Sequence, residues 1–448
     1  MKKTLALVLA LVMVLSLAAC GSTAAPSTET PAEAPAETPA EAPAEAEVPA
    51  TVSEPITITI WHTMSSGSKG DRMTASIQEF NETNPYGITV QEVYQGSYDE
   101  LQAKLMQAVS AGTQPEIAML SCNAAPVLAA NDCLADLSAY VARDNFDMDN
   151  LIEGLAQYVV YNGEIITFPY VRSTAIFYYN KGLFDAAPSS LEELVETSKK
   201  IYADSNGEIK GMGFSIEANY YQQALLASLN GTGILNADGT AAGGLDDGSV
   251  LQFLNDWHTW TEEGYCAIPA LSNADSALKE DFINGKLASY ISSAGTATGL
   301  MKSCEENGID LGIGYMPGYG GYTAPIGGGS LGVIEKGNTQ QEIAAAWEFI
   351  KFILSDEQVG LTHRDTGYVP VTKSAAESEF VQNLWAENPA FKTAFEQLDY
   401  AREIPFSVYT SEWTATMKQA FSEVIQGRDV TPEKEVEKLQ AEAEVLFN

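Results

Sequence analysis

Aromatic and small polar residues make up the part of this sequence best suited to ligand chemistry. A flat ring can stack on the C–H face of a sugar or polyol while hydroxyls, amides and backbone N–H groups bind its oxygens. A single aromatic ring more often belongs to a hydrophobic core than to a binding site. The evidence for a binding site is therefore that many aromatic residues fall in segments expected to be loops. These aromatic residues are Trp61, Tyr94, Tyr98, Tyr170, Tyr220, Tyr221, Tyr315, Tyr319, Tyr322, Tyr368, Tyr409 and Trp413.

Motifs for phosphate, metal or nucleophilic chemistry do not appear in recognisable form. Gly327–Gly329 lacks the spacing and the lysine of a phosphate loop, and fits a hinge or a close backbone approach better. No Gly-x-Ser-x-Gly or His-Glu-x-x-His motif occurs, and His62, His258 and His363 are far apart. We therefore expect no metal, no cofactor and no catalytic residue. The sequence does not exclude the two catalytic carboxylates of a glycan hydrolase, because among 60 Asp and Glu residues some must lie close together in the folded chain.

The cysteines of the body give no sign of a metal site. Cys122, Cys133, Cys266 and Cys304 match no metal-binding spacing, and four are too few for a disulfide framework in so long a chain. We prefer free buried thiols, with a bridge between Cys122 and Cys133 as the alternative.

The charge balance excludes some classes of partner. The chain has 24 Lys and Arg against 60 Asp and Glu, a formal net charge of −36. Nucleic acid and anionic lipid surfaces both favour clustered basic residues, so neither is expected as a partner. With 45% hydrophobic residues the chain can still bury a core.

The first 55 residues are expected to be a leader and a spacer. Lys2 and Lys3 precede an apolar run and a Leu-Ala-Ala-Cys ending, so residues 1–19 are interpreted as a signal peptide. The ending resembles the lipobox of bacterial lipoproteins, which would lipidate Cys20. An ordinary signal with an incidental cysteine is the alternative. Residues 20–55 then form a linker of Pro, Ala and Glu that could reach roughly 100 Å.

From Ile56 onward the pattern alternates between strands and helices. The expected strands are Ile56–Trp61, Ile88–Val93, Ile117–Leu120, Ile165–Phe168, Ile176–Tyr179, Leu287–Ile291 and Leu331–Ile334. Helical spacing is clearest in residues 341–354, whose apolar positions fall at offsets 0, 4, 7 and 11. This alternation predicts α/β layers with mostly parallel sheets, and a helical segment of about 90 residues follows.

Several segments, met in order between residues 56 and 430, carry a further signal. They are Ile60-Trp61-His62-Thr63-Met64, Tyr94-Gln95-Gly96-Ser97-Tyr98, Phe168-Pro169, Ser173-Thr174, Tyr178-Tyr179-Asn180-Lys181, Gly327–Leu331 and Thr366–Lys373. Together they resemble family 1 extracellular solute-binding proteins of ABC importers. The last two are similar to the glycerol-3-phosphate-binding branch of that family in particular.

The resemblance implies an α/β, two-lobed periplasmic-binding-protein-like fold (type II) with a hinge, an interlobe cleft and a helical C-terminal end. The first lobe would comprise residues 56–168 and 327–358, and the second 169–326 and 359–448. It also implies a monomer on the extracellular face of the bacterial cell membrane, which the lipid on Cys20 alone would anchor. Such a protein delivers a small molecule to the transmembrane subunits of an ABC permease.

Carried over by position, the family's cleft contacts fall on residues from both lobes. Tyr98 would lie at the edge of the first lobe and Ser173 just past the first crossing. Tyr220 and Tyr221 stand where the branch has a tryptophan platform. The implied ligand-binding set is Tyr98, Cys122, Arg172, Ser173, Tyr220, Tyr221, Ser293, Gly328, Gly329 and Tyr368.

Two departures from the glycerol-phosphate branch bear on the ligand. Where the branch has a glutamate, this chain has Ser121-Cys122-Asn123. Where it has a phosphate-binding arginine, Phe406–Trp413 contains no basic residue. Arg172 is either a substitute cation or a surface arginine. From residue 56 onward the chain carries 22 Lys and Arg against 53 Asp and Glu, a balance that opposes a phosphate ligand.

These observations predict a ligand-binding lipoprotein of a carbohydrate-type ABC importer that captures a sugar or related polyol and is not an enzyme. Glycerol 3-phosphate or a glycerophosphodiester is the alternative ligand within the same class. The alternatives of other classes are a lipid-anchored glycan hydrolase, with two carboxylates roughly 5 to 10 Å apart, and a structural lipoprotein without a cleft.

Overall fold

The computed structural model describes residues 49–121, 124–216, 220–402, 405, 407–427 and 430–447. The predicted signal peptide, the lipidation site at Cys20 and the candidate ligand contact at Cys122 lie outside these residues. Residues 47–448 cluster as one compact unit.

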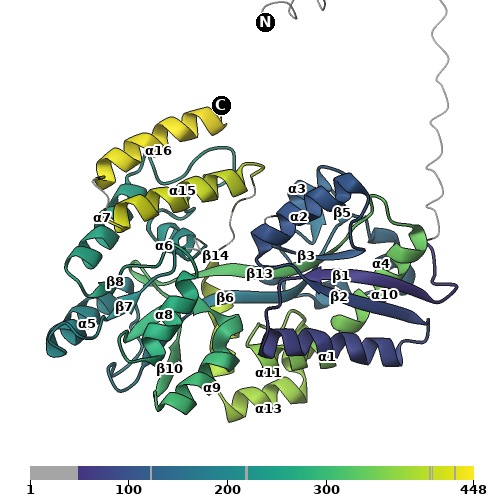
Figure 1. Ribbon diagram of the computed structural model, residues 1–448, viewed down its shortest axis with the longest axis horizontal. Helices are drawn as coiled ribbons and strands as arrows, with labels where there is room; N and C mark the ends of the chain where they lie inside the picture. Colours follow the sequence, from purple (N-terminus) through teal and green to yellow (C-terminus); the bar gives the residue numbers. More distant parts are fainter. Residues whose placement is uncertain are drawn as a thin grey trace, which may run out of the picture. The chain divides into compact units, whose positions relative to one another are not determined.

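A parallel three-stranded group opens the folded part of the chain (Figure 1). β1 (Ile56–His62) pairs with β2 (Ile88–Tyr94) on one side and with β3 (Ile117–Ser121) on the other. α1 (Ser68–Thr83) joins β1 to β2, and α2 (Tyr98–Ala111) joins β2 to β3. Both helices bury the apolar stripes that their spacing predicts, which packs them against the strands.

Two long strands connect this group with the rest of the body. β6 (Phe168–Asn180) pairs with β13 (Ala324–Val333) through its first half, and with β9 (Ser289–Ser293) and β10 (Leu311–Gly314) through its second half. β13 also pairs with β3. One eight-stranded sheet results, with the main order β10-β6-β13-β3-β1-β2, and Figure 1 shows β6 and β13 passing between its two sides.

The expected strands form, but the prediction of mostly parallel sheets was wrong. β13 runs antiparallel to both β3 and β6, and β6 runs antiparallel to β9 and β10. The reason is that each connecting strand crosses back between the two sides, a path that local periodicity does not report. The strand expected at Ile176–Tyr179 is the second half of β6, and the one at Ile165–Phe168 is split between β5 (Glu164–Ile165) and the start of β6.

The remaining elements surround this sheet. The other short strands are β4 (Val160–Tyr161), β7 (Met212–Gly213), β8 (Cys266–Ala267), β11 (Pro317–Gly318), β12 (Gly321–Tyr322) and β14 (Ala401–Arg402). The helices before β13 are α3 (Ala125–Ala129), α4 (Ser138–Asp144), α5 (Leu191–Asp204), α6 (Tyr220–Asn230), α7 (Ser249–Glu262), α8 (Ala274–Ile283) and α9 (Ala297–Asn307). Single 3-10 turns lie at Met148–Asn150, Glu153–Leu155, Ala294–Thr296 and Gln397–Tyr400.

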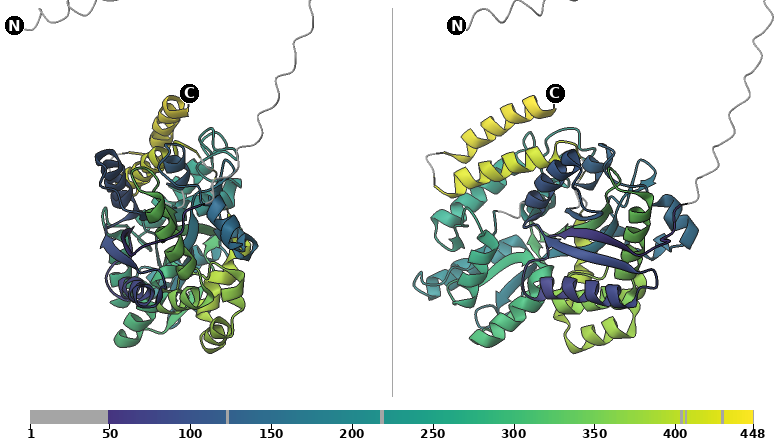
Figure 2. Two further views of the ribbon diagram at one scale, coloured as in Figure 1. Left: turned by 90° about the vertical axis from the view of Figure 1, so that its right-hand side faces the viewer. Right: turned by 45° about the vertical axis from the view of Figure 1, so that its right-hand side comes forward.

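The C-terminal part is helical, as the sequence predicts, apart from β14. Its helices are α10 (Gln340–Ile353), α11 (Asp356–Thr366), α12 (Lys373–Glu377), α13 (Glu379–Glu387), α14 (Ala390–Glu396), α15 (Thr410–Ile425) and α16 (Pro432–Phe447). α11 packs against α1 and α9, whereas α15 and α16 pack against each other and against α7. Figures 1 and 2 show this last pair side by side in each view.

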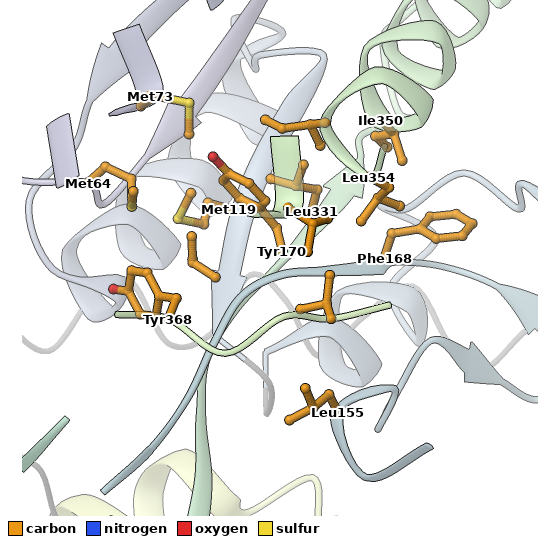
Figure 3. Packing of buried hydrophobic residues seen from close by; sticks show 14 of the residues in the cluster. Met64, Met73, Met119, Leu155, Phe168, Tyr170, Leu331, Ile350, Leu354 and Tyr368 are labelled. Carbon is orange, nitrogen blue, oxygen red and sulfur yellow. The ribbon is translucent and has the colours of Figure 1, made fainter. Parts of the chain in front are cut away.

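Separate hydrophobic clusters pack against the connecting strands. One surrounds Phe168, Leu331 and Ile350, and Figure 3 shows methionines from β3 and from the region of α1 reaching the same cluster. Another surrounds Trp257 and Phe421, where α7 meets α15. β6 contributes alternate residues to both clusters, Ile176 and Tyr178 to the first and Ala175 and Phe177 to the second.

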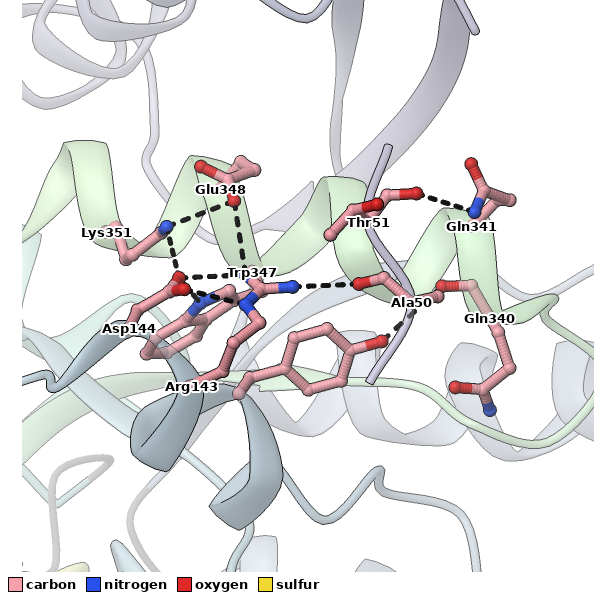
Figure 4. Close-up of polar contacts among 10 residues, drawn as sticks. Ala50, Thr51, Arg143, Asp144, Gln340, Gln341, Trp347, Glu348 and Lys351 are labelled. Carbon is pink, nitrogen blue, oxygen red and sulfur yellow. Dashed lines mark hydrogen bonds and ion pairs between the residues drawn. The ribbon is translucent and has the colours of Figure 1, made fainter. Parts of the chain in front are cut away.

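An ion-pair network fastens α4 to α10 beneath the first group of strands. Arg143 pairs with Asp144 and Glu348, and Lys351 pairs with the same two carboxylates. The Trp347 indole N–H also donates to Asp144, over 2.8 Å (Figure 4). These donors hold the pKa of Asp144 well below its ordinary value, with the hydrogen bond from Arg143 as the largest influence.

The cysteines within the described residues agree with the preferred interpretation. Cys133, Cys266 and Cys304 are free and buried. Burial raises the pKa of each thiol, to about 11 for Cys304, so these sulfurs stay protonated and unreactive. Among the described residues no helix combines the length and the apolar character needed to cross a membrane.

Candidate functional site

The glycine run of β13 is the place where the two sides of the molecule meet. A Cβ atom built on Gly327 would lie 3.1 Å from the ring of Tyr220, and one built on Gly329 would lie 2.5 Å from the hydroxyl of Tyr98. Tyr98 begins α2 on one side, and Tyr220 begins α6 on the other. Since two residues of a strand span about 7 Å, tyrosines from opposite sides approach one short stretch of bare backbone.

Local sequence fixes the position of Tyr98. Ser97 caps α2 by accepting the N–H of Glu100, and the Glu100 side chain accepts the N–H of Ser97 in return. The cap sets the first helical residue, so Tyr98 projects from the start of the helix. Its ring is partly buried, and it packs over Gly329 rather than lying on the outer surface.

Gly328 adopts a backbone conformation that side chains resist. Its φ angle is +85°, and a Cβ built there would lie 2.0 Å from the carbonyl oxygen of Val171. The neighbouring strand β6 presents Arg172 opposite Gly328 and Ser173 opposite Gly327. Only glycine fits this close approach of two strands, which explains the motif without any role in phosphate binding.

Arg172 is not a surface residue. It is 0% exposed, at the centre of β6, and its carbonyl oxygen accepts the N–H of Val369 over 3.0 Å. The surface interpretation is therefore excluded, and the residue lies beside Gly328 on the paired strand. A buried guanidinium is stable only with compensating partners.

The second wall of the site is a group of hydroxyls on α6 and β9. The hydroxyl of Tyr220 donates to that of Tyr221 over 3.0 Å. Ser293 lies near the hydroxyl of Tyr220 and Ser292 near that of Tyr221, and each serine offsets part of the rise in its neighbour's pKa. Desolvation is the main reason why the pKa values of both tyrosines lie well above their ordinary value. Both phenols therefore remain neutral hydrogen-bonding groups at physiological pH.

Tyr368 connects this wall with the first group of strands. Its ring lies against Gly295, where a built Cβ would come within 2.5 Å, and the Nζ of Lys69 is 5.3 Å from the ring centroid. Tyr368 thus has α1 on one side and the turn after β9 on the other. Its own segment is held by His363, whose Nδ1 is 2.8 Å from the Tyr368 carbonyl oxygen.

The structure brings together most of the residues that the resemblance implies. Around Gly327–Gly329 it places Tyr98, Arg172, Ser173, Tyr220, Tyr221, Ser293 and Tyr368. Cys122 lies outside the described residues. Whether these side chains bind a ligand stays a prediction.

Two neighbours of the site carry charge and had no signal in the sequence. Lys69 lies in the first turn of α1 and approaches Tyr368 only through folding. Asp275, in α8, accepts the Ser292 hydroxyl over 3.3 Å, and its charge helps to raise the pKa of Tyr178, Tyr220 and Tyr221. No motif distinguishes either residue, because each depends on a contact between distant segments.

Other aromatic residues of the expected loops have structural roles, and Tyr170 and Trp413 lie in β6 and α15 rather than in loops. Trp413 is 0% exposed and donates its indole N–H to the carbonyl oxygen of Ile234 over 2.7 Å, so it belongs to a core. Tyr170 is likewise a core residue. Tyr315 and Tyr322 pack against Tyr400, with ring centroids 5.1 to 5.7 Å apart within this trio. The aromatic residues that the sequence analysis singled out therefore include both residues of the candidate site and residues that only pack in the core.

Metal-binding groups and hollows do not suggest a different site. No cluster of three or more His, Cys, Asp or Glu residues that could hold a metal occurs in the described part of the chain. A hollow of about 360 Å³ lies beside α15, lined in part by Ile216, Leu271 and Lys418. It shares no residue with the group around Gly327–Gly329.

Known proteins resemble this chain in sequence. Residues 75–393 match the model of the family described as bacterial extracellular solute-binding protein. The sn-glycerol-3-phosphate-binding periplasmic protein UgpB of Rhizobium meliloti is 28% identical over 361 residues, which cover 75% of this chain and 80% of the relative. The protein of the same name from Salmonella typhimurium is 25% identical over 382 residues, covering 78% and 82%.

Solved structures show the same fold. UgpB from Mycobacterium tuberculosis in complex with glycerophosphocholine superposes with a TM-score of 0.78 at 22% identity, covering 88% of this chain and 98% of that one. The GacH receptor of Streptomyces glaucescens gives a TM-score of 0.77 at 19% identity, covering 88% and 98%. These likenesses confirm the expected two-lobed α/β fold. Because the family model matches well over half of its residues, the chain belongs to the bacterial extracellular solute-binding proteins.

Proposed function

We propose that this chain captures a sugar or related polyol for an ABC importer and is not an enzyme. The observation that carries the proposal is the approach of Tyr98 and Tyr220, from opposite lobes, to the glycine run of β13. Ser173 and Ser293 add hydroxyls beside it. Rings and hydroxyls in this arrangement supply the stacking and hydrogen bonds that a polyol requires.

Hinge closure is the proposed mechanism of capture. Residues 56–168 and 327–358 would form one lobe, and residues 169–326 and 359–448 the other. A ligand that touches both lobes binds the closed form better, so its binding shifts the population toward that form. The closed, loaded monomer would then dock on the permease subunits.

A lipid on Cys20 is the proposed anchor at the extracellular face of the membrane. The Leu-Ala-Ala-Cys ending of the leader supports it. The Cys20→Ala variant should remain unprocessed or be shed into the medium, as fractionation and blotting would reveal. Normally processed Cys20→Ala protein that stays with the membrane would contradict lipid anchoring.

A phosphate-bearing ligand is the second candidate. The relatives named for sn-glycerol 3-phosphate, and the solved complex with glycerophosphocholine, favour it. Lys69 beside Tyr368 and the buried Arg172 supply positive charge near the glycine run. Against it stand Asp275 in the second wall and the excess of acidic residues in the body.

Calorimetry can decide between these ligands. We expect binding of at least one of glycerol, glucose, maltose and maltotriose, and no binding of sn-glycerol 3-phosphate or glycerophosphocholine. Tyr98→Ala and Tyr220→Ala should each weaken binding of the neutral ligand by about 1 to 3 kcal/mol. Tyr94→Ala, which removes a tyrosine that is 54% exposed, is the matched control.

The salt dependence of binding and variants of Lys69 and Arg172 test the phosphate-bearing ligand. Glycerol phosphate binding that weakens between 50 and 500 mM NaCl, and that is lost in Lys69→Gln or Arg172→Ala, would overturn the neutral-polyol proposal. Because Arg172 is fully buried, the melting temperature of its variant must be measured alongside. Release of reducing sugar from a glycan by the purified protein would favour the hydrolase alternative instead.

A further inference from the structure

The ring of His62 links the end of β1 to the turn that follows it and to β2. His62 is the last residue of β1 and is 3% exposed. Its Nδ1 accepts the N–H of Met64 over 3.2 Å, and its Nε2 lies 3.3 Å from Oε2 of Glu92. A neutral imidazole has one acceptor nitrogen and one donor nitrogen. The contact with Met64 therefore makes Nδ1 the acceptor, and Nε2 keeps the proton that it donates to Glu92.

The turn that His62 holds, residues 63–67, leads directly into α1. The Met64 side chain is 2% exposed and lies in the hydrophobic cluster that Figure 3 shows. Nearer to α1, the carbonyl oxygen of Ser65 accepts the N–H of Gly70 over 2.8 Å. A movement of the Met64 backbone would therefore also displace the first turn of α1.

The first turn of α1 meets segments from distant parts of the chain. The Nζ of Lys69 is 5.3 Å from the ring centroid of Tyr368, a candidate ligand contact. A Cβ built on Gly299 of α9 would lie 4.0 Å from the Oγ of Ser68. The position of the turn therefore determines how α1 approaches the candidate site.

Protonation of His62 would remove the acceptor that holds this turn. An imidazolium ring carries a proton on both nitrogens, so its Nδ1 would face the N–H of Met64 as a second donor. The contact of Nε2 with Glu92 would become an ion pair, but it lies on the opposite side of the ring and does not hold the turn. The charged ring thus favours β2 over the turn.

The surroundings of the ring favour its neutral form. Burial lowers the pKa of His62 below the ordinary histidine value, and the charge of Glu92 offsets part of this effect. The other oxygen of Glu92 accepts the hydroxyl of Thr74 in α1 over 2.7 Å. Tyr94 of β2 has its ring centroid 6.0 Å from that of His62, and β3 contains no titratable residue.

We propose that His62 is a positioning residue for ligand capture, because its neutral ring holds residues 63–67 and the start of α1 in place, and that acidification releases this turn and weakens ligand binding. This inference rests on the proposed capture of a small molecule at the glycine run of β13, and adds a regulation of that capture by pH. Affinity should be complete above the pH at which His62 titrates and fall as the pH drops through it.

The state of the ring can be measured without a ligand. ¹⁵N-labelled histidine gives resonances from only three residues, which are assigned by replacing each in turn. At pH 8 we expect His62 to have an unprotonated Nδ1 and a protonated Nε2. With ¹³C-labelled methionine methyl groups, the Met64 resonance should shift with the same midpoint as the protonation of His62. A protonated Nδ1 at pH 8, a ring that stays neutral down to pH 4, or a Met64 resonance that does not follow His62 would overturn the proposal.

Two amide substitutions separate the roles of the two ring nitrogens. The side-chain oxygen of Asn can accept the N–H two residues further on, as in an Asx turn, and so can replace Nδ1. The longer Gln side chain carries its amide toward the position of Nε2 instead. Neither amide titrates, so His62→Asn should keep the wild-type affinity at pH 7.5 and lose the decrease at acid pH. His62→Gln should bind about tenfold more weakly at every pH, and the control His258→Gln, on α7, should keep the wild-type profile.

Calorimetry between pH 5 and 8 supplies the binding profile. The probes are glycerol, glucose, maltose, maltotriose, sn-glycerol 3-phosphate and glycerophosphocholine, and each one that binds at pH 7.5 is followed across the range. Wild-type affinity should fall by up to about tenfold per pH unit below the His62 midpoint, because the competent fraction falls in that proportion. The ratio of the affinities of the wild-type protein and His62→Asn cancels the titration of phosphate groups and of other side chains. Circular dichroism and the melting temperature verify that each variant is folded.

The outcomes separate this inference from the proposed function. The same pH profile in the wild-type protein and His62→Asn, or equal affinities of His62→Asn and His62→Gln, would overturn the role of His62 and leave ligand capture standing. Failure of every probe to bind the wild-type protein would overturn the proposed capture of these ligands, and with it the regulation by pH. The histidine and methionine spectra would still decide whether His62 holds the turn.

Discussion

At the scale of single residues, the glycine run of β13 decides which side chains can approach. Gly327 and Gly329 have tyrosines where their own side chains would stand, and Gly328 faces the backbone of β6. The first two positions exclude a side chain because of a neighbour's ring, which can move. Gly328 excludes a side chain because of the Val171 carbonyl group and its own positive φ angle, and changing either would require the backbone to move.

The Gly328→Ala variant should therefore lose stability as well as binding. We expect a loss of about 2 to 4 kcal/mol in the free energy of unfolding, from left-handed backbone strain and from the clash with Val171. Gly320→Ala is the matched control, because its φ angle is +69° but nothing lies within 4 Å of a built Cβ. Urea denaturation measures both variants. Equal losses would show that the contact with Val171 is unimportant.

At the scale of elements, one histidine ties two helices to the segment that carries Tyr368. His363 of α11 is 0% exposed, and its Nε2 accepts the indole N–H of Trp385 of α13 over 2.8 Å. Since Nε2 accepts, Nδ1 carries the proton and donates to the Tyr368 carbonyl oxygen. Burial lowers the pKa of His363 to about 4, so the ring stays neutral in the folded protein.

This burial predicts a pH dependence of stability. The unfolded chain takes up a proton near the ordinary histidine pKa of 6.5, whereas folded His363 stays neutral down to about pH 4. Its contribution is therefore complete above pH 6.5 and falls by up to about 3 kcal/mol as the pH drops to 4. His363→Gln, whose amide can both accept and donate, should remove this slope.

The measurement is urea denaturation between pH 4 and 7.5, taken as the difference between the wild-type protein and each variant. The subtraction cancels the carboxylates that titrate in the same range. His258→Gln, at a partly exposed position on α7, should keep the wild-type slope. A wild-type slope in His363→Gln would contradict the assignment of the pH dependence to His363.

At the scale of the whole molecule, two helices from distant parts of the chain meet away from the connecting strands. α1 belongs to the first group of strands, and α9 follows β9 on the other side. A Cβ built on Gly299 of α9 would lie 4.0 Å from the Oγ of Ser68, at the start of α1. The contact between α1 and α9 must break if the lobes separate to admit a ligand. A disulfide across this contact would therefore hold the lobes together.

A Ser68→Cys, Gly299→Cys double variant should lock the lobes together when oxidised. A sulfur introduced at position 68 takes the place of that Oγ, so a shift of about 1 Å brings it within bonding range of a sulfur at position 299. We expect X-ray scattering to give a smaller radius of gyration for the oxidised form than for the ligand-free wild-type protein. Adding the neutral ligand should compact the wild-type and reduced proteins but not the oxidised one. Equal radii for all forms would contradict hinge closure.

The sequence by itself determined the local elements. Alternating β-branched residues specified β1, and helical spacing specified the buried stripes of α1, α2 and α10, because hydrophobic periodicity is a property of neighbouring residues. The order of short motifs along residues 56–430 also indicated the family, which the family match confirms. The candidate residues Tyr98, Ser173 and Tyr220 followed from that resemblance rather than from periodicity.

Only the tertiary structure decided what surrounds these residues. The burial of Arg172 and the placement of Lys69 beside Tyr368 both depend on segments that are far apart in the chain. The antiparallel course of β6 and β13 was also invisible in the sequence, because strand periodicity is the same in either direction. Contacts between distant segments depend on how the elements pack, and no local pattern records that packing.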